Sequence, residues 1–391
     1  MSIAFVVPRY GDGIVGGAET LTRGLAEHLA ARGTPVEVLT TCARDHHTWR
    51  NALPEGREVV NDVPVHRFPV RARNERLFGR IQQRIDRGDP LPIEDQLAWA
   101  EESVSSPSLY SHLLRHREGY ELVCFAPYLF GTTFWGSQLV PERAVLIPCL
   151  HDEPYARLPL IRAMFEGCHG FIFNSPPEAE LARRLYAIGD RPWGVVGLGF
   201  DPPSPPSPER FRRRHRLEGP FLLYVGRKEK GKNVPLLIEY FLAYRERFRR
   251  DLTLCLVGEG PIQAPRGGER AIRDLGYLGP SEKLDAYAAA TVVCQPSVNE
   301  SFSIVIMEAW LAGTPVLVHA GCPVTTYHLQ GSGGGLAFGD YFEFAEALDL
   351  LLGDEALRAK LAAQGRAYVL EEYSWPAVMA RFEAARERLR G

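Results

Sequence analysis

The sequence lacks the long apolar runs of a membrane protein and any strong excess of charge. Its 391 residues contain no stretch approaching 18 apolar residues. The N-terminus, MSIAFVVPRYGDG, has neither the basic start nor the apolar length of a signal peptide. The net charge of −3 gives no reason to expect a nucleic-acid partner. We therefore expect a cytoplasmic protein whose only route to a membrane is peripheral contact with the inner face of the plasma membrane.

Cysteine and histidine patterns typical of metal sites are also missing. The seven cysteines are odd in number, and no two have C-x-x-C spacing. Most lie within apolar runs, which predicts buried free thiols in a reducing compartment. His46 and His47 have no partner at the spacing of a zinc site. Lysine is scarce, and three of the five lysines in the sequence, Lys228, Lys230 and Lys232, fall in one short loop.

What is present is an alternation of short apolar runs with helical segments. Ile3–Val7 is such a run, and the four-residue spacing of leucines in Ala18–Arg32 predicts the helix that follows it. Continuous apolar strands separated by helices predict parallel sheets that are covered on both faces. The stretch DPPSPPSP interrupts the alternation, and its prolines predict a linker. We predict an α/β protein with domains at 1–200 and 219–375, joined by a linker at 201–218.

One basic segment, Arg71–Arg87, stands apart from this alternation. Leu77, Ile81 and Ile85 recur every four residues, and arginines surround them. A basic amphipathic helix of this kind can lie on an anionic membrane surface. A surface helix that packs on its own domain explains the same pattern and is the more common case.

Two glutamates eight residues apart are the most informative pair. Glu300 follows a predicted strand, and Glu308 lies in the helix for which Ser303 is a plausible N-cap. Both carboxylates can accept hydrogen bonds from the hydroxyl groups of a polyol. The N–H groups of Ser301, Phe302 and Ser303 suit a phosphate oxygen. Taken alone, solvated carboxylates near a helix start explain the spacing as well.

A second motif, YVGRKEKGKNVPLLI at residues 224–238, supplies cations. Arg227 and Lys232 stand five residues apart across a turn that follows a predicted strand. Two cations from one loop can neutralise a diphosphate. A solvated basic turn is the alternative, and we expect Lys228 and Lys230 to face solvent.

A third motif, GDGIVGGAET, is rich in glycine. Gly11, Gly13 and Gly16 have the G-x-G-x-x-G spacing of a dinucleotide-binding loop. Two details argue against that interpretation: three residues separate the strand from Gly11, and no acidic residue ends the second strand, VEVLTT. Small residues such as Gly16 and Gly17 also allow backbone N–H groups to approach an anion.

Together these motifs resemble the retaining glycosyltransferases of the GT-B fold, particularly glycosyltransferase family 4 (glycosyl transferases group 1). The stretch PSVNESFSIVIMEAWLAGTPV is similar to the family's Glu-x(7)-Glu signature, although Ser301 and Ser303 stand where many members have glycine. Arg227 and Lys232 resemble its Arg-x(4)-Lys diphosphate site. The resemblance implies two Rossmann-like domains with parallel sheets facing across a cleft. The first would hold the acceptor and the second the sugar nucleotide, with a last helix at 376–391 returning to the first.

The resemblance also implies a role for each site residue. Catalytic roles fall to His151, Arg227, Lys232 and Glu300. Donor binding falls to Gly16, Gly17, Arg227, Lys232, Gly258, Leu278, Glu300, Ser301, Phe302, Ser303 and Glu308. Acceptor binding falls to Glu19, His151 and Asn174. Within this set, Glu308 would hold the ribose hydroxyls and Glu300 the hydroxyls of the donor sugar.

The implied activity is that of a hexosyltransferase (EC 2.4.1.-). It would move a hexose from a UDP-, GDP- or dTDP-sugar to a sugar, lipid-linked or small-molecule acceptor, with retention at the anomeric carbon. No Asp-x-Asp motif stands where a metal would bridge the diphosphate, so we expect neither a metal nor a cofactor. Synthesis of a surface polysaccharide or glycolipid is the expected setting by analogy. A disaccharide synthase, a sugar-nucleotide epimerase and, more distantly, an NAD(P)-dependent oxidoreductase that uses the Gly11–Gly16 loop are the alternatives.

Overall fold

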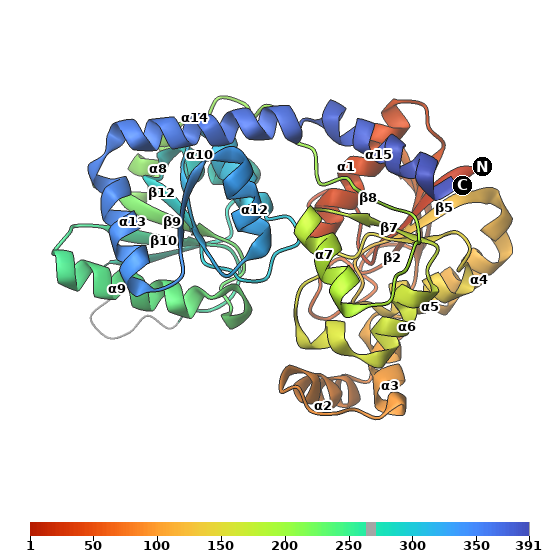
Figure 1. Ribbon diagram of the computed structural model, residues 1–391. Coiled ribbons are helices and arrows are strands. Elements are labelled where there is room, and N and C mark those ends of the chain that lie inside the picture. The colour runs from red at the N-terminus through yellow and green to blue at the C-terminus, as the bar shows by residue number, and fades with distance from the viewer. Residues whose placement is uncertain (263–270, 391) are drawn as a thin grey trace. The chain divides into compact units, whose positions relative to one another are not determined.

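The computed structural model describes residues 1–262 and 271–390 and divides the chain into two compact units (Figure 1). Unit 1 contains residues 1–199 together with the C-terminal segment from Trp375, and unit 2 contains Phe200–Ser374. Each unit is built around its own sheet. Among the described residues, no helix combines the length and the apolar character needed to cross a membrane.

Unit 1 contains an eight-stranded sheet with helices on both sides. The strands are β1 (Ser2–Val6), β2 (Val36–Thr41), β3 (Gly56–Val60), β4 (Val63–Phe68), β5 (Tyr120–Phe125), β6 (Ala144–Leu146), β7 (Gly170–Phe173) and β8 (Trp193–Val195). The helices are α1 (Gly17–Ala31), α2 (Glu75–Asp86), α3 (Ile93–Ser103), α4 (Pro107–His116), α5 (Gly131–Leu139), α6 (Pro159–Gly167), α7 (Pro176–Leu185) and α15 (Trp375–Arg390). The spatial order is β3-β4-β2-β1-β5-β6-β7-β8, and only the edge pair β3–β4 is antiparallel.

The last helix, α15, completes unit 1. Its Trp375 ring stacks on His28 of α1 with ring centroids 3.8 Å apart. Gly24 and Gly199 make room for that ring, because a Cβ at either position would come within 2.3 Å of it. At the other end of α15, Arg386 and Arg390 both bind the Glu121 carboxylate of β5. Contacts at both ends of α15 therefore hold this helix on unit 1.

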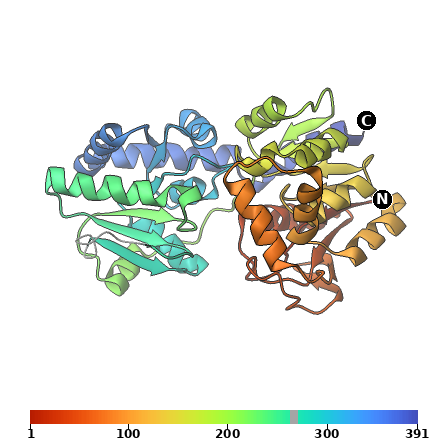
Figure 2. The same cartoon turned by 90° about the horizontal axis from the view of Figure 1, so that it is seen from below.

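Unit 2 contains a six-stranded sheet in which every neighbouring pair is parallel. The strands are β9 (Phe221–Val225), β10 (Thr253–Val257), β11 (Ile272–Gly276), β12 (Val292–Gln295), β13 (Val316–His319) and β14 (Gly335–Phe338), in the order β11-β10-β9-β12-β13-β14. The helices are α8 (Pro208–His215), α9 (Val234–Phe248), α10 (Pro280–Ala289), α11 (Ile304–Leu311), α12 (Pro323–Ser332), α13 (Tyr341–Gly353) and α14 (Glu355–Glu372). Helices α9 and α13 share one core cluster with the sheet (Figures 1 and 2).

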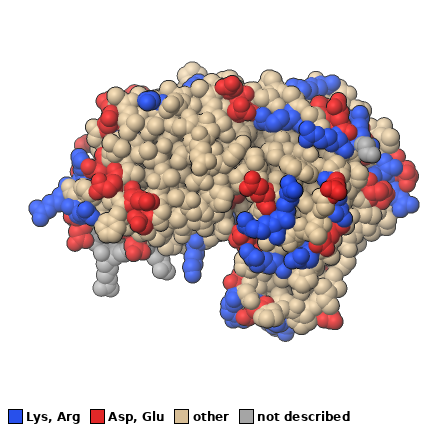
Figure 3. Space-filling view, viewed as in Figure 1, with Lys and Arg blue, Asp and Glu red and all other residues tan. Residues whose placement is uncertain are grey.

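The basic segment at 71–87 forms α2, which packs within unit 1. Ile81 and Ile85 are buried in the core cluster, and Leu77 is packed against it. Acidic partners neutralise part of its charge, since Arg73 pairs with Glu75 and Arg84 with Asp95. Figure 3 shows basic and acidic side chains mixed over the lobe that α2 and α3 form. The apolar face of this helix is thus used inside its own unit.

Candidate active site

The loops that follow β9 and β12 leave the sheet of unit 2 at the point where its strand order reverses. The chain runs outward from β9 to β10 and β11, and β12 then starts on the other side of β9. Open parallel sheets bind ligands at the carboxyl ends of their strands at such a point. The first loop carries Arg227 and Lys232, and the second carries Glu300 and Ser303. Residues far apart in the sequence are thereby brought to one edge.

Lys232 and Glu300 join these two loops. The Lys232 Nζ lies 2.8 Å from Glu300 Oε1, and it also donates to the backbone oxygen of Asn299 at 3.2 Å. Both side chains are largely buried, at 19% and 11% exposed. Arg227 behaves differently, because its side chain is 57% exposed and pairs with Glu229. Lys232 is therefore a fixed cation of the site, while the Arg227 guanidinium lies at its surface.

Glu308 lies on α11 and is held by two residues of α10. Lys283 Nζ lies 2.6 Å from its Oε1, and the Tyr287 hydroxyl donates to its Oε2 at 2.8 Å. Burial, with a contribution from Glu308, raises the pKa of Tyr287 well above its ordinary value, so the hydroxyl keeps its proton. No motif or spacing in the sequence predicts these roles for Lys283 and Tyr287. The scarcity of lysine was the one available signal for Lys283.

Ser303 occupies the N-cap position of α11 in an unusual conformation. Its φ of 67° lies in the left-handed region, and its side chain makes no capping hydrogen bond. The Oγ is buried and has no hydrogen-bond partner among the described residues. The prediction that Ser303 is the N-cap residue of α11 is confirmed, although its side chain makes no capping hydrogen bond. Glycine would adopt this φ without strain.

The neighbouring loops of unit 2 are closely packed. Gly258 has a φ of 127°, and a Cβ there would come within 2.1 Å of the Gly226 oxygen. Leu278 is buried. The expectation that Lys228 faces solvent is wrong, because its side chain is 3% exposed and pairs with Asp274. Lys230 is exposed as expected. Lys228 is therefore a buried structural residue of this loop, whereas Lys230 is a surface residue.

In unit 1 the glycine-rich loop after β1 is supported by an ion pair. Arg9 Nε donates to Glu19 Oε1 at 2.9 Å, and the Arg9 side chain also bonds the backbone oxygens of Val15 and Arg44. A Cβ at Gly16 would collide with the Glu19 carboxylate, whereas nothing lies within 4 Å of the corresponding position at Gly17. Glu19 therefore shapes this loop, and its partner Arg9 was missed because a lone arginine after a strand carries no spacing signal.

His151 and Asn174 follow β6 and β7 and are linked through one buried carboxylate. Glu178 of α7 accepts the N–H of Leu150 at 2.6 Å and that of Asn174. Burial raises the pKa of the Glu178 carboxyl to about 8, and the backbone donors partly oppose that shift. His151 Nδ1 lies 3.8 Å from Glu153 Oε1. Asn174 is buried, and its side chain is directed at Cys149. No motif in the sequence predicts this positioning role of Glu178.

The chain is similar in sequence to known glycosyltransferases. Residues 207–368 match the family model of glycosyl transferases group 1. The D-inositol 3-phosphate glycosyltransferase of Xylanimonas cellulosilytica is 27% identical, over 91% of this chain and 88% of the relative. The phosphatidyl-myo-inositol mannosyltransferase of Mycobacterium leprae is 28% identical, over 97% of this chain and 94% of the relative.

Two solved structures share the fold over almost the whole chain. Sucrose-phosphate synthase from Thermosynechococcus elongatus superposes with a TM-score of 0.72 and 22% identity, covering 99% of this chain and 98% of that one. HepE from Anabaena, in complex with UDP and glucose, gives a TM-score of 0.70 and 17% identity, covering 98% of each chain. This chain has the GT-B fold of glycosyltransferases. The expected α/β fold of two Rossmann-like domains is thereby confirmed, and the family match contains Arg227, Lys232, Glu300 and Glu308.

Proposed function

We propose that this protein is a retaining hexosyltransferase of family 4 that uses a nucleoside diphosphate sugar. The observation that carries the proposal is the pair of lysine–glutamate contacts around α11, Lys232 with Glu300 and Lys283 with Glu308. They place two cations, two carboxylates and a helix N-terminus at one edge of the sheet. Such a combination suits a ligand with both phosphate and hydroxyl groups.

The diphosphate of the donor would bind Lys232, Arg227 and the N–H groups at the start of α11. Lys232 can donate three hydrogen bonds, so it can keep its contact with Glu300 and also donate to a phosphate oxygen. The exposed pair of Arg227 with Glu229 is worth little, and the guanidinium can exchange that partner for phosphate. Gly258 and Leu278 would border the nucleotide. Charge neutralisation by these two cations would take the place of a metal ion.

The two carboxylates would recognise hydroxyl groups. Glu308 is fixed by Lys283 and Tyr287, and a fixed acceptor suits the two neighbouring hydroxyls of a ribose. Glu300 would accept from the hydroxyls of the donor sugar. In these roles the glutamates bind and orient the donor, whereas an acid–base pair would need to exchange protons with it.

The reaction would be a same-face displacement. The bond between the anomeric carbon and the diphosphate would break first. The acceptor hydroxyl oxygen would then bond the anomeric carbon, while a β-phosphate oxygen takes the proton of that hydroxyl. We assign the Gly17 N–H to the donor phosphate and His151 to the side of the transferred sugar. Glu19 and Asn174 would border the acceptor. The roles of Arg9 and Glu178 would be to hold these loops in place.

The acceptor is proposed from chemistry and from the named relatives. The names of two of those relatives specify D-inositol 3-phosphate and phosphatidyl-myo-inositol. We therefore place inositol phosphates and phosphatidylinositol among the first acceptors to test, beside sugar acceptors of surface polysaccharides. Peripheral membrane contact through residues 71–87 stays a prediction. It would rest on exposed arginines such as Arg76 and Arg80, because the apolar face of α2 is buried.

A binding screen followed by product analysis tests the proposal. We expect the melting temperature of the purified protein to rise with at least one of UDP, GDP and dTDP and to be unaffected by NAD(P). NMR of the product formed from the matching sugar nucleotide should show the anomeric configuration of the donor. Stabilisation by NAD(P) alone, or an inverted product, would contradict the proposal. A free sugar nucleotide epimer as the product would favour the epimerase alternative instead.

A further inference from the structure

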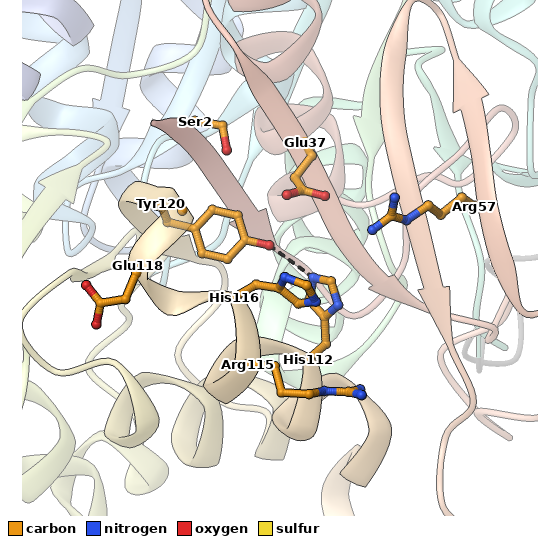
Figure 4. A pocket seen from close by; sticks show the side chains of 9 residues that line it. Ser2, Glu37, Arg57, His112, Arg115, His116, Glu118 and Tyr120 are labelled. Atoms are coloured by element: carbon orange, nitrogen blue, oxygen red, sulfur yellow. Dashed lines mark hydrogen bonds between the residues drawn. The ribbon is translucent and has the colours of Figure 1, made fainter.

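Unit 1 contains a pocket at the edge of its sheet opposite to the Gly16–Gly17 loop. The pocket has a volume of about 260 Å³ and lies at the amino ends of β1, β2 and β5 (Figure 4). The Gly16–Gly17 loop follows the carboxyl end of β1. Five residues of strand, roughly 16 Å at about 3.3 Å per residue, separate the two ends. The pocket is therefore separate from the loops to which we assign donor and acceptor binding.

The floor of this pocket is a buried chain of polar groups. His112 and Tyr120 are 4% and 2% exposed, and the His112 Nε2 lies 3.0 Å from the Tyr120 hydroxyl. The Glu37 carboxylate lines the same pocket, and it adds to the effect of burial in raising the pKa of Tyr120. Burial lowers the pKa of His112 to about 4. A neutral imidazole thus lies in hydrogen-bond contact with the tyrosine, and a carboxylate lines the same pocket.

The rim of the pocket carries arginines, and the exposed carboxylate of Glu118 also lines it. Arg57 of β3 is exposed and makes no side-chain hydrogen bond or ion pair with any residue in 1–262 or 271–390. Arg115 bonds only a backbone oxygen, that of Ser111, within the same described ranges. The His116 ring lies 4.4 Å from that of His112. Figure 4 shows Arg57 reaching from β3 toward the imidazoles at the end of α4. Arg57 and Arg115 add to the effect of burial in lowering the pKa of His112.

We propose that this pocket binds a small phosphate monoester that carries free hydroxyl groups, such as a sugar phosphate. Arg57, Arg115 and His116 would hold the phosphate, for which guanidinium groups are well suited. Glu37 is the reason to expect hydroxyl groups, because a carboxylate accepts from a hydroxyl and repels a bare anion. The volume is below the roughly 300–1,000 Å³ of sites for drug-sized ligands, so the ligand is small. Bound at the edge opposite to the glycine loop, it would act as an effector and would not be consumed.

Binding to protein labelled at histidine tests this proposal directly. The probes are glucose 6-phosphate, ribose 5-phosphate and glycerol 3-phosphate, with glucose and inorganic phosphate for comparison. We expect at least one phosphorylated polyol to shift the ring signals of His112 and His116 at millimolar concentration, and glucose to shift neither. Arg57→Gln should weaken that binding about tenfold or more, because it removes a charge-assisted contact from an exposed position. Its melting temperature should equal that of the wild type.

Two further variants separate the proposal from adventitious binding. Arg183→Gln removes an exposed arginine of α7 that has no partner in the described ranges, and it should leave the affinity unchanged. Glu37→Gln should reduce the preference for the phosphorylated polyol over inorganic phosphate. The proposal is overturned if none of the three phosphate esters shifts the histidine signals. It is also overturned if Arg57→Gln and Arg183→Gln lose the same amount of affinity, or if inorganic phosphate binds as tightly as the esters, which would mean an adventitious ion only.

Discussion

At the residue scale, Lys232 can be compared with Lys230, two positions away in the same loop. Lys232 is largely buried against Glu300, whereas Lys230 is exposed. If Lys232 stabilises the departing diphosphate, Lys232→Ala should lower kcat/KM by roughly 10²–10³. Lys230→Ala, a matched change of charge, should leave it within about twofold, a shift of ~0.4 kcal/mol. Steady-state kinetics with the donor identified by the screen provides the measurement. Equal effects of the two variants would remove Lys232 from its proposed role.

Glu308 allows a test that depends on one hydroxyl of the ligand. Replacing Glu308 with Gln keeps its size but weakens its hydrogen bonds to hydroxyls, which are stronger when the acceptor is charged. If Glu308 holds the ribose, Glu308→Gln should weaken UDP binding by roughly tenfold, or ~1.4 kcal/mol. It should affect 2′-deoxy-UDP much less. Calorimetry with both nucleotides gives the comparison. A loss that is the same for the two ligands would show that Glu308 acts on some other part of the donor.

The conformation of Ser303 predicts a stabilising substitution. A serine at φ 67° costs about 1–2 kcal/mol, and the buried unpaired hydroxyl adds to that cost. Glycine removes both but loses about 0.5–1 kcal/mol through chain entropy. We expect Ser303→Gly to stabilise unit 2 by about 1 kcal/mol and to raise its melting temperature by a few degrees. Ser301→Gly is the control, because Ser301 has no positive φ. Calorimetry in which the control is stabilised as much as Ser303→Gly would refute this account.

Spacing in the sequence identified the candidate residues but not the partners that fix them. Arg227 with Lys232, and Glu300 with Glu308, stand at short and recognisable separations. Lys283 and Glu308, by contrast, meet only because α10 and α11 pack side by side. The same holds for Glu178, whose two backbone donors come from the ends of two different strands. The sequence predicts that Lys228 faces solvent, because the alternating charges of its loop do not reveal that Asp274 lies beside it.

At the scale of elements, α15 depends on one carboxylate. Glu121 is 9% exposed and binds both Arg386 and Arg390. Hydrogen bonds from Arg386, with those from Arg390, lower the pKa of Glu121 to about 2. We expect Glu121→Gln to cost about 1.5–3 kcal/mol and to speed hydrogen exchange in 375–390. Glu118→Gln, which changes an exposed carboxylate next to this strand, should have little effect.

The pH dependence of this contact has a definite sign. A carboxyl whose pKa is lowered by folding contributes its full stabilisation above its unfolded pKa of about 4.5 and loses it as the pH falls toward 2. Exchange in α15 should therefore accelerate between about pH 4.5 and 2 in the wild type, relative to the rest of unit 1. In Glu121→Gln that extra acceleration should be absent. If it persists, other carboxylates control the docking of α15.

Most elements of the two sheets were predicted from their apolar runs, and the exceptions have physical causes. β3 is an edge strand whose residues are mostly exposed, so Gly56–Val60 lacks the continuous apolar character of strands such as β9 and β12. The proline-rich stretch was expected to be a linker, but its last proline starts α8, where the fixed φ of proline favours the first helical turn. Buried parallel strands are thus the elements that composition alone reveals best.

At the scale of the whole molecule, the two units differ in how the chain builds them. Unit 2 is one continuous stretch, Phe200–Ser374, and its core cluster draws only on residues of that stretch. Unit 1 needs α15 from the far end of the chain, whose Trp375 and Phe382 pack on α1 and β1. We therefore expect a fragment of residues 200–374 to unfold cooperatively and to bind the donor nucleotide. A fragment of residues 1–199 should lack a cooperative transition.

A permuted form of unit 1 separates a missing helix from a general failure to fold. Arg390 binds Glu121, and the neighbouring Tyr120 pairs with Ser2, so the two chain ends lie side by side (Figures 1 and 2). Residues 375–390 can accordingly be joined through a short glycine–serine linker to Met1, ahead of residues 1–199. We expect this permuted chain to regain a cooperative thermal transition, measured by circular dichroism. If residues 1–199 alone melt as sharply and at the same temperature, α15 is an accessory to unit 1, and the buried Trp375 and Phe382 contribute little to its stability.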